Sequence, residues 1–106
     1  MSSCIFCDII AGKAKRSLVW EDENAIVIND IHPAASTHLL VIPKKHATNL
    51  TDMTDEETAR LLLVVKKMIK DMNISKYRVV TNGGGAELIH HVHIHIMGAV
   101  DPHRNL

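Results

Sequence analysis

The most constraining feature of the chain is a run of alternating histidine and apolar residues at positions 91–97, His-Val-His-Ile-His-Ile-Met. Four of the eight histidines fall within the six positions 90–95. A period of two is typical of a β-strand with one apolar and one polar face. We therefore predict a strand whose apolar residues face a core and whose histidines form a row about 13 Å long on the other face. These histidines are His91, His93 and His95.

Three explanations fit such a histidine row: the face is simply solvated, it binds a metal, or it performs catalysis on phosphorus. Two histidines at positions i and i+2 of a strand can bind one zinc ion. Alternatively, one imidazole attacks phosphorus while its neighbours orient it, hold the phosphate oxygens and protonate the leaving group. Strict alternation argues against the solvated face, and the choice between metal binding and catalysis depends on the rest of the chain.

Length and composition indicate one globular domain of ordinary size, spanning residues 1–106. Lys plus Arg equals Asp plus Glu at twelve each, and Phe, Trp and Tyr occur once each. A neutral chain with so few aromatic residues is not expected to bind a long nucleic acid. No apolar run approaches the ~20 residues of a membrane span and no signal peptide is recognisable, so we expect a cytoplasmic protein that does not bind membranes.

The only two cysteines, Cys4 and Cys7, are separated by two residues near the start of the chain. The apolar residues around them fit a short amphipathic helix that ends before Gly12. Their spacing lets both thiolates bind one zinc ion or close a redox disulfide. No βαβ pattern accompanies the pair, so a zinc half-site that needs two further ligands is favoured over a redox site. Two small core residues without any ligand role are the remaining alternative.

Hydrophobic periodicity predicts an α+β fold with about five antiparallel strands and one long helix beside the short N-terminal helix. The long helix is predicted over residues 54–73, where Thr54 and Glu57 form a capping box at its start. Apolar side chains recur along it at intervals of three and four residues. The strands are predicted at residues 17–21, 25–29, 37–43, 77–81 and 91–97.

Further candidate residues lie where the predicted strands end. Asp30 follows one strand, and a carboxylate there can bind a ribose or merely cap a loop. His38 and His46 flank the next strand, and neither decides a function alone. Three glycines in the loop 82–86 let main-chain amides approach an anion closely, or simply connect two strands. The loop lacks the Lys-Ser/Thr of a P-loop and opens no helix, which excludes that motif.

Taken together, these motifs resemble the histidine-triad superfamily, whose motif His-φ-His-φ-His-φ-φ, with φ apolar, is complete at residues 91–97. The resemblance covers nearly the whole chain. Further matches, in the order that the family shows, are the Cys-Ile-Phe-Cys near the start, the segments 29–33 and 37–46, and the glycine loop. The chain is most similar to the small histidine-triad nucleotide-binding proteins, which are homodimeric phosphoramidases and nucleotidyl hydrolases.

The resemblance implies that His93 is the nucleophile, which attacks the α-phosphorus of a nucleoside 5′-phosphoramidate and forms a nucleotidyl-histidine that water then cleaves. A hydrogen bond from its other ring nitrogen to a carbonyl is expected to fix the tautomer. His95 and His38 are implied to contact the phosphate or to relay a proton, and His91 completes the cluster. Nothing in this chemistry requires a catalytic metal.

By the same resemblance, the expected ligand is a purine nucleotide of the AMP type. Asp30 is expected to bind the ribose, Phe6 and Ile31 to line the base pocket, and amides of the glycine loop to hold the phosphate oxygens. The residues expected to contact the nucleotide are Phe6, Asp30, Ile31, Asn82, Ala86, Leu88, His93 and His95.

Some relatives carry a structural zinc ion, and the resemblance implies that its ligands here are Cys4, Cys7, His46 and His91. Two thiolates and two imidazoles make a closed tetrahedral shell, which is structural in kind. The resemblance also implies a homodimer, for which we expect pairing through the helix 54–73 and the strand that starts near Tyr77.

Two departures from the family pattern bear on function. Relatives usually place Gln and then Ser or Thr before the histidine strand, where the hydroxyl touches the phosphate, whereas this chain has Glu87 and Leu88. Residues 100–106 lack a tryptophan that some relatives carry in a tail reaching the partner's site. Besides a phosphoramidase, the alternatives are a dinucleoside polyphosphate or other nucleotidyl hydrolase, and a nucleotide-binding regulatory protein with little activity, for which Glu87 is the main argument.

Overall fold

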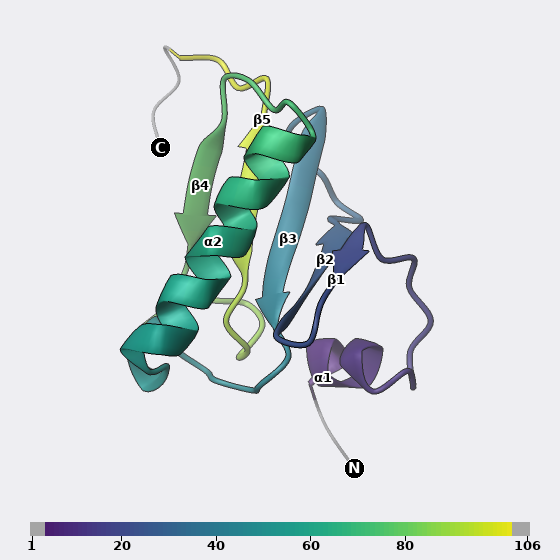
Figure 1. Cartoon of the computed structure of the whole chain (residues 1–106), viewed down its shortest axis with the longest axis vertical. Coiled ribbons are helices and arrows are strands. Elements are labelled where there is room, and N and C mark those ends of the chain that lie inside the picture. The colour runs from purple at the N-terminus through teal and green to yellow at the C-terminus, as the bar shows by residue number, and fades with distance from the viewer. Residues whose placement is uncertain (1–3, 103–106) are drawn as a thin grey trace.

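Residues 4–102 of the chain are described by a computed structural model, which has the predicted α+β architecture (Figure 1). Its one long helix crosses an antiparallel sheet, and a short helix lies near the N-terminus. In chain order the elements are α1 (Ile5–Ile10), β1 (Trp20–Glu21), β2 (Ala25–Asn29), β3 (Thr37–Pro43), the 3-10 helix η1 (Leu50–Asp52), α2 (Asp55–Asp71), β4 (Arg78–Thr81) and β5 (Ile94–Gly98).

The five strands form one sheet in the order β1-β2-β3-β5-β4, and every neighbouring pair is antiparallel. The histidine-bearing strand β5 therefore lies between β3 and β4 rather than at an edge. His95 stands opposite Leu40 of β3 and Val80 of β4. This central position fixes the main chain on both sides of His95.

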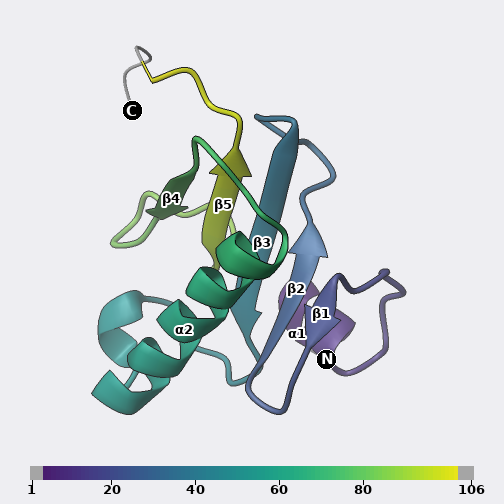
Figure 2. The same ribbon diagram turned by 45° about the horizontal axis from the view of Figure 1, so that its top comes forward.

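The two helices cover opposite faces of the sheet, and Figure 2 shows α2 in front of the strands with α1 behind them. The stripe of α2 that faces the sheet consists of Leu61, Val64, Val65 and Met68. It packs against apolar residues of the central strands, Val27, Leu39, Val41, Ile94 and Ile96, together with Val92 just before β5. On the other face, Phe6 and Ile9 of α1 pack against Ile26, Ile28, Leu40 and Ile42.

The prediction that the histidine strand begins at His91 is wrong, because β5 begins at Ile94. Before that residue the chain bonds outside the sheet: the N–H of Val92 donates to the carbonyl of Ala47 (2.7 Å), and the N–H of His91 donates to that of Ile89 (2.9 Å). The predicted alternation of faces nevertheless holds over residues 91–97. Val92 joins the core under α2, whereas His91 and His93 are buried on the side of α1.

The other predicted boundaries differ little from the observed ones. β2 and β3 have the predicted bounds, and the Thr54–Glu57 capping box precedes α2 as expected. The strand predicted at 17–21 is reduced to β1, and η1 was not predicted. Within residues 4–102, no helix is both long enough and apolar enough to span a membrane.

Candidate active site and metal centre

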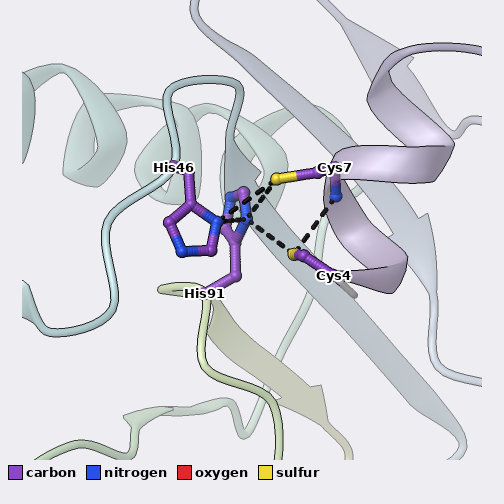
Figure 3. Close-up of side chains that lie close together, drawn as sticks. All are labelled: Cys4, Cys7, His46 and His91. Carbon is purple, nitrogen blue, oxygen red and sulfur yellow. Dashed lines mark hydrogen bonds between the residues drawn. The ribbon is translucent and has the colours of Figure 1, made fainter. Parts of the chain in front are cut away.

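Four predicted zinc ligands from three separate segments point toward a common centre, as Figure 3 shows. Cys4 and Cys7 lie at the start of α1, His46 follows β3, and His91 precedes β5. The Nδ1 atom of His91 lies 3.2 Å from Cys4 Sγ, 3.5 Å from Cys7 Sγ and 3.1 Å from His46 Nδ1. Cys7 Sγ lies 3.2 Å from His46 Nδ1. We call these four residues the Cys2His2 centre.

The donor atoms of the Cys2His2 centre fit a zinc ion. A tetrahedral zinc with two sulfur and two nitrogen ligands separates its N–N and N–S ligand pairs by about 3.3–3.6 Å, which is close to the observed N–N and N–S spacings of 3.1–3.5 Å. His91 is correctly prepared for this role, because its Nε2 lies 2.8 Å from the Pro43 carbonyl oxygen and must donate its proton there. The lone pair of the neutral ring is then on Nδ1, the atom that faces the other three ligands.

The hydrogen bond made by His93 leaves a lone pair on the ring nitrogen that faces outward. Its Nδ1 lies 2.7 Å from the carbonyl oxygen of His91, so that nitrogen carries the proton and donates it. The neutral ring therefore keeps an unprotonated Nε2, as a nucleophile requires. The ring is buried and packs edge-on against Phe6, with 5.1 Å between ring centroids.

His38 and His95 form a hydrogen-bonded chain that assigns both of their tautomers. The main-chain N–H of Ala34 donates to His38 Nδ1 (2.9 Å), so the proton of neutral His38 is on Nε2. That nitrogen lies 2.9 Å from His95 Nδ1, which must therefore accept. The proton of neutral His95 is then on Nε2. His93 and His95 thus carry opposite tautomers, one with a free lone pair and one with an N–H at the same ring position.

Asp30, His38 and His95 also bring three potential metal ligands within 4.8 Å of one another. Their hydrogen bonds argue against a metal there. The single lone pair of neutral His38 already accepts the Ala34 N–H, so a metal at its Nε2 would require an imidazolate or the loss of that bond. Asp30 Oδ2 lies 3.4 Å from His38 Nε2, and Asp30 Oδ1 accepts the N–H of His32. This second cluster suits proton transfer.

The surroundings of His91 and His95 favour the neutral form of both imidazoles. Burial lowers the pKa of His95 below its ordinary value, and the neighbouring imidazoles of His93 and His38 lower it further, against the opposing effect of Asp30. Burial is likewise the main cause that lowers the pKa of His91, although its hydrogen bond to Pro43 acts in the opposite direction. Neutral imidazoles are the forms that the assigned tautomers require.

The glycine loop 82–86 is tied down on both sides, and Glu87 is one of its anchors. The carboxylate of Glu87 accepts the N–H of Gly85 (2.8 Å) and lies 2.9 Å from His90 Nδ1, with its side chain only 5% exposed. Hydrogen bonds from its own N–H, from Gly85 and from His90 lower the pKa of Glu87, so it is ionised at neutral pH. On the other side, the N–H of Gly84 donates to Asn49 Oδ1 (2.8 Å).

The remaining residues predicted to contact the nucleotide are less uniformly placed. Phe6 is buried against His91 and His93, so it supports the imidazoles from behind. Ile31 and Leu88 are 69% and 97% exposed, which leaves both side chains open to a ligand. Asn82 and Ala86 lie exposed in the glycine loop. Of the C-terminal tail considered above, residues 103–106 lie outside the described part of the chain.

Several groups in the site were missed by the sequence reasoning. They are the main-chain N–H of Ala34, the carbonyls of Pro43 and His91, and the hydroxyl of Thr81, which donates to the His93 carbonyl (3.1 Å). Main-chain groups give no sequence signal, because every residue except proline supplies both of them. Asn49 gave a weak signal, as it begins the capping box of η1.

The sequence matches the family model of the HIT domain over residues 11–101. It is 37% identical to the adenosine 5′-monophosphoramidase of Schizosaccharomyces pombe over 97 residues, which cover 90% of this chain and 73% of the relative. Among solved structures, a HIT family hydrolase from Legionella pneumophila has a TM-score of 0.83 at 37% identity, with coverage of 93% of this chain and 95% of that one.

A histidine triad protein from Clostridium difficile superposes with a TM-score of 0.87 at 32% identity, and the match covers 100% of this chain and 98% of the other. The two proteins therefore share the α+β fold described above, including the five-stranded sheet. Because the family model covers most of the sequence and these relatives agree with it, the chain belongs to the histidine-triad (HIT) family.

Proposed function

We propose that the protein is a HIT-family nucleotide hydrolase that cleaves the P–N bond of nucleoside 5′-phosphoramidates and releases the nucleoside monophosphate. The observation that carries the proposal is the pair of opposite tautomers at His93 and His95, which offers a lone pair for nucleophilic attack beside an N–H that can donate a hydrogen bond to the phosphate. Their ring centroids are 5.0 Å apart. The phosphoramidase activity named for the Schizosaccharomyces pombe relative supports the same reaction class.

In the first step, the lone pair on His93 Nε2 attacks the α-phosphorus and a nitrogen–phosphorus bond forms. The original P–N bond breaks, and the departing nitrogen, which takes its extra proton from solvent, leaves as a neutral amine while the Nε2–H of His95 stays on its ring and donates a hydrogen bond to a phosphate oxygen. His93 becomes cationic as it bonds to phosphorus. Its Nδ1–H remains on the His91 carbonyl throughout, which holds the ring in line and stabilises the developing charge.

In the second step, water attacks the phosphorus and the bond to His93 breaks. The proton that this water loses passes to solvent and replaces the one taken up in the first step, and His93 returns to its neutral form with the lone pair on Nε2. The products are a nucleoside monophosphate and an amine from one phosphoramidate and one water. His38 stays neutral, because its Nδ1 accepts the Ala34 N–H, and its Nε2–H keeps His95 in the required tautomer.

We infer that substrate binding uses the surfaces around this pair. Asp30, a half-buried carboxylate beside His38, is the proposed ribose ligand. Main-chain amides of the glycine loop and of Leu88 are the proposed phosphate ligands, because the loop is held by Asn49 and Glu87 in a fixed conformation. An exposed Ile31 suits the apolar face of a purine.

We also propose that the Cys2His2 centre holds a structural zinc ion, since its donor set and spacing fit one. A zinc ion with two thiolates and two imidazoles has a closed shell, so its contribution is to cross-link α1, the segment after β3 and the segment before β5. Metal analysis of purified protein tests this proposal. About one zinc per chain, lost in Cys4→Ala, is expected, and a folded, metal-free protein that takes up no zinc contradicts it.

The experiment that tests the main proposal is AMP release from adenosine 5′-phosphoramidate by wild type, His93→Ala and a control, His32→Ala. His32 is exposed, and its contact with Asp30 runs through a main-chain N–H that the substitution keeps. We expect turnover to vanish in His93→Ala and to persist in the control.

The outcome also separates the alternatives. If a dinucleoside polyphosphate yields AMP faster than the phosphoramidate does, the protein is a nucleotidyl hydrolase of that second kind. If folded wild type binds AMP but releases none from either substrate, the protein is a nucleotide-binding protein and the catalytic proposal fails.

A further inference from the structure

The segment that carries the nucleophile is not held by the sheet. β5 begins at Ile94, so residues 91–93 lack the strand pairing that fixes His95. Other bonds hold them: the N–H of Val92 donates to the carbonyl of Ala47, and the His93 carbonyl accepts the Thr81 hydroxyl. Ala47 directly follows His46, a member of the Cys2His2 centre. The conformation of this segment is therefore determined largely by contacts to the loop after β3.

One residue, His91, belongs to both centres. Its fully buried side chain lies at the Cys2His2 centre, with Nδ1 toward the thiols and Nε2 on the Pro43 carbonyl. Its main-chain carbonyl accepts the Nδ1–H of His93 at 2.7 Å. Anything that fixes the ring of His91 thus also fixes the acceptor that orients the nucleophile.

We propose that the Cys2His2 centre positions His93, with His91 as the positioning residue between them. When the four ligands share a metal ion, the metal joins His46 to His91, in addition to the main-chain hydrogen bond that joins Val92 to Ala47. The two links together hold the carbonyl of His91 in place. When the metal is lost, residues 91–93 are restrained only by single hydrogen bonds and by side-chain packing, and the hydrogen bond from His93 Nδ1–H to the His91 carbonyl is weakened. The activity readout of this inference rests on the proposed function, whereas its structural readout does not.

The test compares zinc-loaded wild type, the same protein stripped by a chelator, and Cys4→Ala. The first measurement is the imidazole NMR signal of the His93 Nδ1 proton, taken without substrate. We expect a single, slowly exchanging signal in the loaded protein, and a broadened or absent one when zinc is removed. The second is steady-state kinetics on adenosine 5′-phosphoramidate, where a misplaced nucleophile lowers kcat roughly 10- to 100-fold and changes KM much less.

A matched control separates positioning from stability. Val64→Ala removes a buried side chain of α2, whose core cluster includes no member of the Cys2His2 centre. We expect it to lower the melting temperature while the zinc content, the His93 signal and kcat stay those of the wild type. If the metal-free protein unfolds, His46→Ala is measured in place of the metal-free protein. In this variant three ligands still anchor α1, whereas the metal no longer joins residues 46 and 91.

The inference is overturned if folded metal-free protein or folded His46→Ala keeps both the His93 signal and kcat of the wild type. It is equally overturned if the protein takes up no zinc. A loaded protein with a zinc-dependent His93 signal but no phosphoramidase activity supports the positioning role and contradicts only the proposed function. The two failures are therefore distinguishable.

Discussion

At the scale of single residues, the site works through the partner that each imidazole has on its inner nitrogen. His93 faces a carbonyl, which can only accept, whereas His95 faces the Nε2–H of His38. Two identical side chains on one face thereby acquire opposite tautomers, on which their proposed chemical roles depend. The ultimate determinant of the second tautomer is the main-chain N–H of Ala34, since it fixes the proton of His38.

This assignment predicts different effects for two substitutions at His38. The amide nitrogen of Gln can take the place of Nε2 and donate to His95, whereas the shorter Asn reaches only the Ala34 N–H. We expect His38→Asn to lower kcat roughly 100-fold, as for loss of a hydrogen-bond donor to the transition state, and His38→Gln to retain most of the activity. Equal losses in the two variants contradict the assignment, and ¹⁵N NMR of the His95 ring reads the tautomer directly.

A second prediction concerns Glu87, which replaces the Gln usual in relatives. Its carboxylate accepts the N–H of Gly85, so we expect it to hold the glycine loop rather than to repel the substrate. Glu87→Gln keeps an acceptor oxygen and removes the charge, whereas Glu87→Ala removes both. If the hydrogen bond between Gly85 and residue 87 is needed for binding, the AMP affinity measured by calorimetry is preserved in Glu87→Gln and weakened in Glu87→Ala. If repulsion dominates, both variants bind AMP more tightly than the wild type.

At the scale of elements, the sequence was informative where the structural cause is local. The apolar runs and flanking turns of β2 and β3 and the capping box of α2 are encoded in consecutive residues; the predicted bounds of both strands agree with the structure, and α2 begins directly after Thr54. The start of β5 was missed, because Val92 bonds to Ala47 far away in the chain. The same division applies to the site. The cysteines and histidines can be recognised in the sequence by residue type, whereas the main-chain donors and acceptors at Ala34, Pro43 and His91 cannot.

The capping box allows a prediction about α2. Thr54 Oγ1 accepts the N–H of Glu57 (3.1 Å), and Glu57 Oε1 accepts the N–H of Thr54 (2.8 Å). Replacing Thr54 by Ala leaves a first-turn donor without its acceptor, which is expected to cost about 1 kcal/mol of unfolding free energy. Urea denaturation measures this loss. Thr58→Ala, on the next turn, serves as the comparison, because its hydroxyl donates to an already used carbonyl and its loss is expected to cost less.

At the scale of the whole molecule, the neutral histidines make stability depend on pH. The pKa of His95 is lowered in the folded protein from an ordinary value of 6.5, mainly by burial. Below that value the unfolded chain binds a proton at His95 that the native protein does not bind, so stability falls as pH decreases through this region and is retained above it. Thermal melts from pH 7.5 to pH 5 are expected to show this loss, and His95→Gln is expected to reduce the slope. An unchanged slope contradicts the prediction, and His32→Gln controls for removal of an exposed histidine.

We propose that two copies of the chain pair through β4. This strand lies at an edge of the sheet, so within the described residues no other strand covers its outer side. Exposed apolar side chains lie on α2, on the turn after it and on β4: Leu62, Met72, Tyr77 and Val79. A two-fold axis beside β4 would join two sheets and bury these side chains against their own copies.

Sedimentation velocity of wild type, Val79→Lys and Leu18→Lys tests this pairing. Val79 and Leu18 are both 39% exposed, but Val79 lies on β4, whereas Leu18 lies just before β1 at the opposite edge of the sheet. A buried lysine without a partner is costly in an interface and harmless in solvent. We therefore expect a wild-type dimer that dissociates in Val79→Lys and persists in Leu18→Lys. A monomeric wild type, or a dimer that only Leu18→Lys disrupts, excludes β4 as the interface.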